Sequence, residues 1–178
     1  SAGCVGPIAN FNVLINPRPV PLVVSGNVLV CDNAQEIYSV SASPGSVYTW
    51  TVFNDLQDTV NVTTDSLTVD WGNAGSGNIN SFETNSFGCN SDTGNIPVTI
   101  NQHPQTLIPN DSASICNNAS YQIIANSTTP AVRWYSDGSG SFNDTTIASA
   151  IYIPSALDTG YIHLTMIAAN PPCANDTG

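Results

Sequence analysis

The chain contains five cysteines, and their spacing limits the chemistry that they can do. They are Cys4, Cys31, Cys89, Cys116 and Cys173. No two of them form a Cys-x-x-Cys pair, the spacing typical of a structural zinc site. Wide spacing favours disulfide bonds, which place the chain in an oxidising compartment. The alternative is that all five cysteines are reduced and that some of them bind a metal ion.

An internal repeat indicates how the cysteines pair. The segment from Cys4 to Pro19 recurs later in the chain as Cys89 to Pro104, with the same internal spacing. Apolar and polar positions recur in register, with Phe11, Val13, Ile15 and Asn16 matching Ile96, Val98, Ile100 and Asn101. The match continues to Cys31 and Trp50, which correspond to Cys116 and Trp134. A period of this size predicts tandem domains.

The repeat predicts two disulfide bonds, Cys31–Cys89 and Cys116–Cys173. Each would close a loop within one repeat and stabilise it by about 4 kcal/mol by restricting the unfolded chain. A small domain with a limited core benefits from such a cross-link. Cys4 is then left unpaired, as the second cysteine of a preceding repeat.

The same period sets the expected domain boundaries. We predict one domain over residues 17–103 and a second over residues 104–178. Residues 1–16 are predicted to be the C-terminal strand of a preceding repeat. The chain is therefore expected to be part of a longer array.

Strand-like alternation is found in both predicted domains. In residues 46–53, Tyr48, Trp50 and Val52 share one face, the two-residue period of a half-buried strand. Turn-forming residues separate several short segments of this kind, and no segment has sustained helical spacing. The pattern predicts an all-β fold of tandem immunoglobulin-like β-sandwiches, each with one disulfide bond.

The three tryptophans are candidates for core packing or for sugar binding. Trp50 and Trp134 occupy corresponding places in the two repeats. Because a strand tryptophan packs on the disulfide of immunoglobulin-type sandwiches, both are predicted to be buried against the bridges. Trp71 ends a strand beside Gly72, where core packing is expected. The alternative for Trp71 is an exposed ring that stacks on a sugar.

The sequence contains no recognisable catalytic motif. His103 and His163 are the two histidines that could act as bases at neutral pH, and His163 is expected to face solvent on a strand. No nucleophile elbow, metalloprotease motif or phosphate-binding loop is present. The carboxylates are scattered in turns rather than paired as in a glycosidase. We therefore expect a protein that is not an enzyme.

The charge balance limits the partners. With 13 acidic residues, two cationic ones and a net charge of −11, the surface repels nucleic acid and anionic lipid. No apolar run is long enough to insert in a membrane. Cofactors are not expected, apart from calcium at turn aspartates, for which Asp32, Asp55, Asp58 and Asp111 are candidates. Their alternative role is that of solvated turn residues.

Several motifs carry a resemblance to a known family. They are Cys31, Tyr48-Thr49-Trp50, Thr68-Val69-Asp70-Trp71-Gly72 and Asn85-Ser86-Phe87-Gly88-Cys89 in the first repeat, and Trp134 to Phe142 in the second. The pattern resembles the PKD-like and immunoglobulin-like tandem repeats of large secreted proteins of Bacteroidetes-type bacteria. The resemblance implies export by the type IX route to the cell surface or the medium. Members occur in gliding-motility adhesins, surface fibres and multidomain polysaccharidases.

The resemblance also suggests sites of modification. Thr59, Ser66, Ser112 and Thr145 lie in motifs similar to the O-glycosylation motif of that bacterial group. In a eukaryotic or archaeal organism, Asn-x-Ser/Thr sequons would take their place. These begin at Asn61, Asn110, Asn118, Asn126, Asn143 and Asn175.

The sequence as a whole predicts a structural repeat module of a long extracellular cell-surface fibre or adhesin. Its partners would be neighbouring repeats of the same chain, other copies or surface glycans. A first alternative is an accessory carbohydrate-binding or spacer module of a secreted polysaccharide-degrading enzyme. A second is a segment of an extracellular filament subunit, in which neighbouring chains donate strands.

Overall fold

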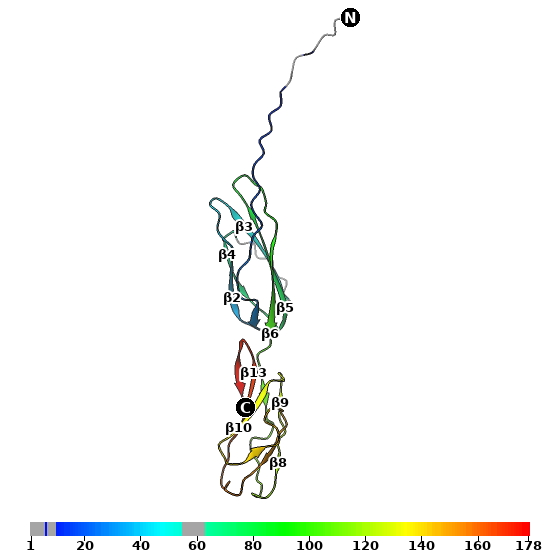
Figure 1. Cartoon of the computed structure of the whole chain (residues 1–178), viewed down its shortest axis with the longest axis vertical. Helices are drawn as coiled ribbons and strands as arrows, with labels where there is room; N and C mark the ends of the chain where they lie inside the picture. The colour runs from blue at the N-terminus through cyan, green and yellow to red at the C-terminus, as the bar shows by residue number, and fades with distance from the viewer. Residues whose placement is uncertain (1–5, 7–9, 55–62) are drawn as a thin grey trace.

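The protein is an all-β molecule made of two bodies stacked along one axis (Figure 1). The structure is a computed structural model that describes residues 6, 10–54 and 63–178. Cys4, Asp55, Asp58, Thr59 and Asn61 therefore lie outside the described residues. The described part of the chain contains no helix that is long and apolar enough to cross a membrane. The expected all-β class is confirmed.

The first body contains strands β1 to β6 in two sheets. They are β1 (Leu29–Cys31), β2 (Gln35–Ser39), β3 (Val47–Phe53), β4 (Ser66–Asp70), β5 (Gly75–Thr84) and β6 (Gly94–Asn101). One sheet has the order β1-β6-β5-β3 and the other pairs β2 with β4. Strand β1 runs parallel to β6, and the remaining pairs are antiparallel.

Alternation along β3 builds the core of this body. Tyr48, Trp50 and Val52 are buried, whereas the side chains between them are at least partly exposed. Trp50 is fully buried, and its ring N–H donates a hydrogen bond of 2.9 Å to the carbonyl oxygen of Thr64. The bond gives the one polar atom of the ring a partner inside the core. The strand predicted over residues 46–53 is confirmed.

The second body contains strands β7 to β14. They are β7 (Thr106–Leu107), β8 (Tyr121–Gln122), β9 (Asn126–Ser127), β10 (Val132–Ser136), β11 (Ser141–Phe142), β12 (Ile151–Ile153), β13 (Leu164–Asn170) and β14 (Cys173–Thr177). Its sheets have the orders β10-β13-β14, β11-β12-β8 and β7-β9. A separate apolar cluster fills this body, with Trp134 stacked on Phe142 at a ring distance of 5.7 Å.

The predicted disulfide pairing is wrong. The structure contains one disulfide in the described residues, Cys31–Cys173, and Cys89 and Cys116 are free. The parallel register of β1 and β6 explains why Cys31 does not reach Cys89. Cys31 lies opposite Asn101, where β6 ends, while Cys89 precedes the start of β6. At about 3.3 Å per residue the strand separates them by roughly 25 Å, and a disulfide requires Cα atoms within about 7 Å.

The predicted burial of Trp50 and Trp134 is confirmed, since they are 0% and 2% exposed. The bridges on which they were expected to pack do not exist, because the disulfide joins the two bodies instead of crossing either core. Hydrogen bonds to backbone carbonyls hold the two rings in its place. Trp71 is 1% exposed and donates to the hydroxyl of Tyr38 at 3.2 Å, so the sugar-stacking alternative for Trp71 is wrong.

Candidate functional site at the junction of the two bodies

The candidate site is the junction at which β6 leaves the first body and the chain enters the second. The disulfide Cys31–Cys173 connects the end of β1 to the start of β14, with a Cα–Cα distance of 5.4 Å. The chain itself crosses between the bodies just after Asn101. Two covalent connections at one junction restrict hinge motion more than one connection does.

Amide side chains reinforce the junction. Asn101 donates from Nδ2 to the carbonyl oxygen of Pro171 at 2.7 Å, and Asn170 donates to the carbonyl oxygen of Gln102 at 2.8 Å. The backbone N–H of Asp32 donates to the carbonyl oxygen of Asn101 at 2.8 Å. The first two bonds connect the end of β6 and the linker to the loop before β14 and so orient the second body on the first, whereas the third holds the end of β6 within the first body.

The carboxylate of Asp32 holds the linker. It accepts a hydrogen bond of 2.9 Å from the backbone N–H of His103, and the same oxygen contacts Nδ1 of the His103 ring. The side chain of Asp32 is 17% exposed and that of His103 is 48% exposed. Asp32 therefore positions the chain between the bodies. The expected role of this residue as a calcium ligand remains a prediction.

The junction also contains the one cluster of metal-ligand types found among the described residues. The sulfurs of Cys31 and Cys173 and a ring nitrogen of His103 lie within 4.8 Å of one another. Two thiolates and an imidazole are zinc ligands, but sulfurs bonded to each other are not thiolates. In the oxidised state seen here, the cluster can cross-link the bodies and cannot hold a metal ion.

The second histidine lies away from the junction, in the loop before β13. His163 Nδ1 pairs with Asp137 at 2.8 Å, and the backbone N–H of His163 donates to the same carboxylate at 2.7 Å. Both bonds lower the pKa of the Asp137 carboxyl. The His163 side chain is 79% exposed, which confirms its expected solvent-facing position. The pair shapes a surface loop of the second body.

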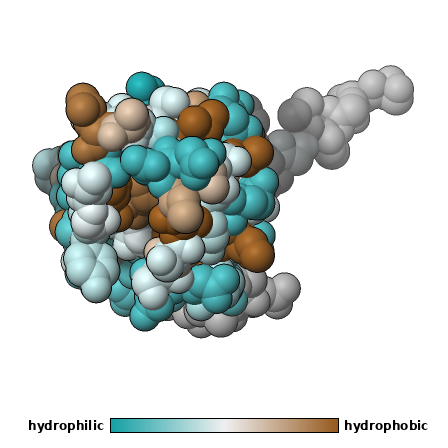
Figure 2. All heavy atoms as spheres, turned by 90° about the horizontal axis from the view of Figure 1, so that it is seen from below, coloured by the Kyte–Doolittle hydropathy of each residue, from teal (hydrophilic) through white to brown (hydrophobic). Residues whose placement is uncertain are grey.

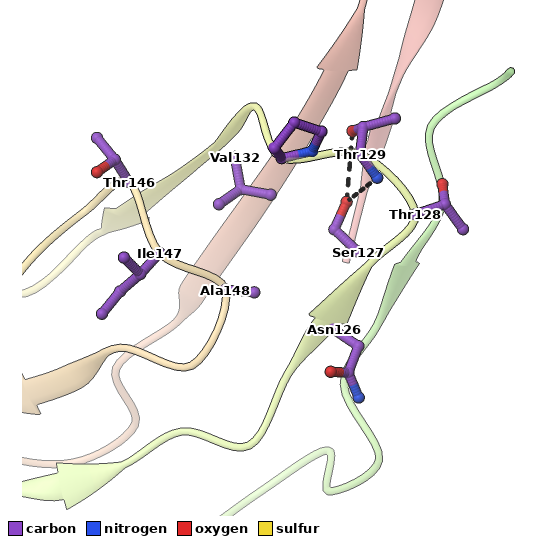
Figure 3. A pocket seen from close by; sticks show the side chains of 9 residues that line it. Asn126, Ser127, Thr128, Thr129, Val132, Thr146, Ile147 and Ala148 are labelled. Atoms are coloured by element: carbon purple, nitrogen blue, oxygen red, sulfur yellow. Dashed lines mark hydrogen bonds between the residues drawn. The ribbon is translucent and has the colours of Figure 1, made fainter.

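An open depression lies on the second body, between the end of β9 and the segment before β12 (Figure 3). Hydroxyl, amide and aliphatic side chains line it, with Ser127 accepting a hydrogen bond of 3.2 Å from the backbone N–H of Thr129. No titratable or aromatic side chain is among its lining residues. Its lining therefore consists of hydroxyl, amide and aliphatic groups, without an ionisable group or an aromatic ring.

The remaining predicted positions are on the surface or outside the described residues. Ser66 at the start of β4, Ser112 and Asp111 are exposed, and Thr145 is half-buried. The carbonyl oxygen of Thr145 accepts a hydrogen bond of 2.9 Å from the backbone N–H of Trp134. These positions are not brought together into one site, so each remains a separate prediction.

The junction was not predicted from the sequence. One feature of the sequence points to the junction, namely that Asn16 recurs in register as Asn101. The repeat alone does not indicate what this asparagine does. The bonds from Asn101 to the loop before Cys173 show what that asparagine does. The pairing of Asp32 with His103 has no such signal, because it joins the residue after β1 to the linker, two segments that are far apart in the sequence.

Residues 17–98 match the model of the PKD-like domain family. The match covers the first body and ends within β6. It supports the PKD-like part of the resemblance. No curated protein matches the chain.

Three solved structures are similar to the chain at low identity. The PKD domain of an M14-like peptidase from Thermoplasmatales archaeon SCGC AB-540-F20 is 13% identical, with a TM-score of 0.34, and the match covers 48% of this chain and 98% of that one. The fibronectin(III)-like modules of Clostridium thermocellum CbhA are 16% identical, with a TM-score of 0.38, and the match covers 87% of this chain and 91% of that one. The D00-D0 domain of intimin is 9% identical, with a TM-score of 0.35, and the match covers 88% of this chain and 97% of that one.

Proposed function

We propose that the chain is a non-enzymatic spacer of a long extracellular fibre or adhesin. Its two bodies are two successive sandwich repeats, with boundaries at residues 17–103 and 104–178. The observation that carries the proposal is the junction, where one disulfide and several side-chain hydrogen bonds join the bodies end to end. A ligand-binding module has no need of such a connection, whereas a spacer depends on it for reach and stiffness.

The mechanism is the suppression of bending. A single linker between two bodies allows the second to swing about it, whereas a disulfide beside the linker leaves little room for that motion. Figure 1 shows the bodies in line along the long axis. A stack of such units has a length that grows with the number of repeats, because each repeat contacts its neighbours.

The environment follows from the same proposal. A disulfide at the junction requires an oxidising compartment, so the fibre is assigned to the cell surface or the medium. The family resemblance adds export by the type IX route. Sugars at Thr59, Ser66, Ser112 and Thr145 would shield a surface that has few charges. Calcium at turn aspartates would be an additional connector, and glycans and other copies of the chain are the further partners.

A second candidate function is that of an accessory carbohydrate-binding module. Two exposed aromatic rings favour it, since Tyr161 is 96% exposed and Tyr135 is 49% exposed. Both lie on or beside the sheet that contains β10 and β13, where a ring could stack on a sugar.

Small-angle scattering combined with a glycan array tests the proposal. The spacer function predicts an elongated particle in non-reducing buffer and no binding to soluble polysaccharides. A Cys31→Ser/Cys173→Ser variant should keep two folded bodies but show a broader distribution of end-to-end distances. A Cys89→Ser/Cys116→Ser variant is the matched control and should scatter like the wild type. Micromolar binding to one glycan, lost in Tyr161→Ala, would replace the spacer with the binding module.

A further inference from the structure

The side chains that hold the junction together are also of the types that bind zinc. Cys31, Cys173 and His103 provide two sulfurs and a ring nitrogen, which all lie within 4.8 Å of one another. Thiolate sulfur and imidazole nitrogen are the usual ligands of zinc in proteins. No second group of three such ligand atoms occurs among the described residues. Figure 2 shows the opposite end of the second body, where hydrophobic and hydrophilic residues are mixed over the surface.

The spacing of the three atoms is close to that of a zinc site. Zinc binds sulfur at about 2.3 Å and nitrogen at about 2.0–2.1 Å, so tetrahedral ligand atoms are about 3.5–3.8 Å apart. The Cα atoms of Cys31 and Cys173 are 5.4 Å apart. Once the two sulfurs are no longer bonded, rotation of the side chains can move them to this separation. The backbone of the junction can stay in place.

The ring of His103 is held at the junction by Asp32. The carboxylate of Asp32 accepts a hydrogen bond of 2.9 Å from the backbone N–H of His103 and contacts the ring at Nδ1. A carboxylate that fixes the orientation of the ring is typical of zinc-binding histidines. Asp32 directly follows Cys31 in the chain, so the residue that orients the ring adjoins one that provides a sulfur. Asp32 is therefore suited to be a positioning residue.

The group is sheltered on one side and accessible on the other. Cys173 is 6% exposed, whereas the side chain of His103 is 48% exposed. A metal ion can enter from the side of the histidine, where solvent also provides a fourth ligand. The chain has a net charge of −11, which favours the approach of a divalent cation.

We propose that the junction binds one Zn²⁺ ion when the Cys31–Cys173 disulfide is reduced. The two thiolates and the His103 ring are the protein ligands, and a water molecule completes the tetrahedron. The ion then joins the end of β1 to the start of β14, as the disulfide does in the oxidised chain. Zinc binding is a property of the reduced chain, so it does not depend on whether the chain is a spacer.

Conversion between the two states requires a reductant or an oxidant. A small dithiol transfers two electrons and two protons to the Cys31–Cys173 bond and becomes a disulfide itself. Zn²⁺ then displaces the two thiol protons, which pass to the solvent. An oxidant reverses the sequence, because the two sulfurs lose two electrons, form the bond again and release the ion.

The test is a cobalt titration of the full chain as a Cys4→Ser/Cys89→Ser/Cys116→Ser variant, in which Cys31 and Cys173 are the remaining cysteines. The chain is reduced with a small dithiol, freed of it without oxygen, and titrated with Co²⁺. We expect one Co²⁺ per chain, with the visible absorption bands of a tetrahedral thiolate site. Zn²⁺ should displace the cobalt and remove the bands. The oxidised chain should have no such bands, since its sulfurs are not thiolates.

Three variants of this chain assign the ligands. His103→Ala should weaken metal binding by about a hundredfold or more, because it removes a ligand, and Asp32→Asn by about tenfold, because it loosens the ring. His163→Ala is the matched control, since it removes the other histidine, which pairs with Asp137 away from the junction. It should bind like the parent. Tryptophan fluorescence shows whether each variant keeps its two cores.

Scattering by the reduced chain provides a second measurement. The distribution of end-to-end distances should be broad without metal and should narrow when Zn²⁺ is added, because the ion joins the two bodies at their junction. The His163→Ala variant should narrow in the same way, and the His103→Ala variant should stay broad at the same Zn²⁺ concentration.

Three results would overturn the proposal. They are a reduced chain without tetrahedral cobalt bands, equal affinities of the His103→Ala and His163→Ala variants, and bands of equal strength in the oxidised chain. None of them would affect the spacer function, which is tested on the oxidised chain without added metal. Compact scattering or glycan binding by that oxidised chain would instead remove the spacer function and leave zinc binding as it is.

Discussion

In the described residues, the larger sheet of the first body has four strands, whereas the sheet of the second body that contains β13 has three. In the first, β6 is hydrogen-bonded on both edges, to β5 and to β1. In the second, β14 pairs with β13 alone, and the segment that matches β1 forms no strand. The comparison shows that the same strand pairing, Trp50 with Ser81 and Trp134 with Met166, has different neighbours at the sheet edge among the described residues. It also predicts that the two bodies respond differently to substitution.

The largest expected effects come from the two core tryptophans. Trp50→Ala and Trp134→Ala should each lower the free energy of unfolding of their own body by about 3–5 kcal/mol, since each removes a buried ring. The effect should be larger for Trp50, whose core is more completely covered. Denaturant unfolding followed by fluorescence measures both.

Tyr135→Ala is the control for this pair, because Tyr135 neighbours Trp134 but is 49% exposed. It should change stability little. Equal small losses in all three variants would mean that the tryptophans do not support the two cores.

A smaller effect is expected from Gly77→Ala in β5. A Cβ atom at Gly77 would lie 2.2 Å from the Trp71 ring, so the ring or the strand must move. We expect a loss of about 1–3 kcal/mol, as in other overpacked cores, confined to the first body. Ser76→Ala, next to it on the exposed face, is the matched control. A thermal melt in which both variants unfold at the same temperature would contradict the assigned packing.

The smallest effect is a pH dependence in the second body. Hydrogen bonds from the backbone N–H groups of Ser155 and Ser139 lower the pKa of Asp158 below its usual 3.8. A carboxyl whose pKa is lower in the folded state stabilises the fold above its unfolded pKa, and this stability is lost as the pH falls through the folded pKa.

Asp158→Asn should therefore flatten the loss of stability that begins as the pH falls below about 4. Thermal melts of the second body across this range measure the change. The unfolding of the first body, which does not contain Asp158, is the internal control and should have the same pH profile in both proteins. Identical profiles for the Asp158→Asn variant and the wild type would show that these hydrogen bonds have no energetic role.

Much of the fold follows from alternation within single strands. Tyr48, Trp50 and Val52 define β3 from the sequence, because burial on one face of a strand depends on a period of two. The all-β class and the burial of three tryptophans were predictable for that reason. The short strands of the second body, such as β8 and β11, were less predictable, because a strand of two residues is too short to show the alternation of buried and exposed side chains.

The disulfide could not be predicted, for a different physical reason. The repeat shows which cysteines correspond to each other, but it does not show whether a disulfide forms within one repeat or between two repeats. That depends on the parallel pairing of β1 with β6, which places Cys31 at the end that faces the second body. The junction contacts of Asp32 and Asn101 depend on the same placement.

Peptide mapping of the oxidised chain without reduction tests the central claim most directly. The claim is that a disulfide joins the two bodies at their junction, and it predicts a peptide pair that contains Cys31 and Cys173. Recovery of Cys31 bonded to Cys89, with Cys116 bonded to Cys173, would contradict it and return each disulfide to the interior of one body.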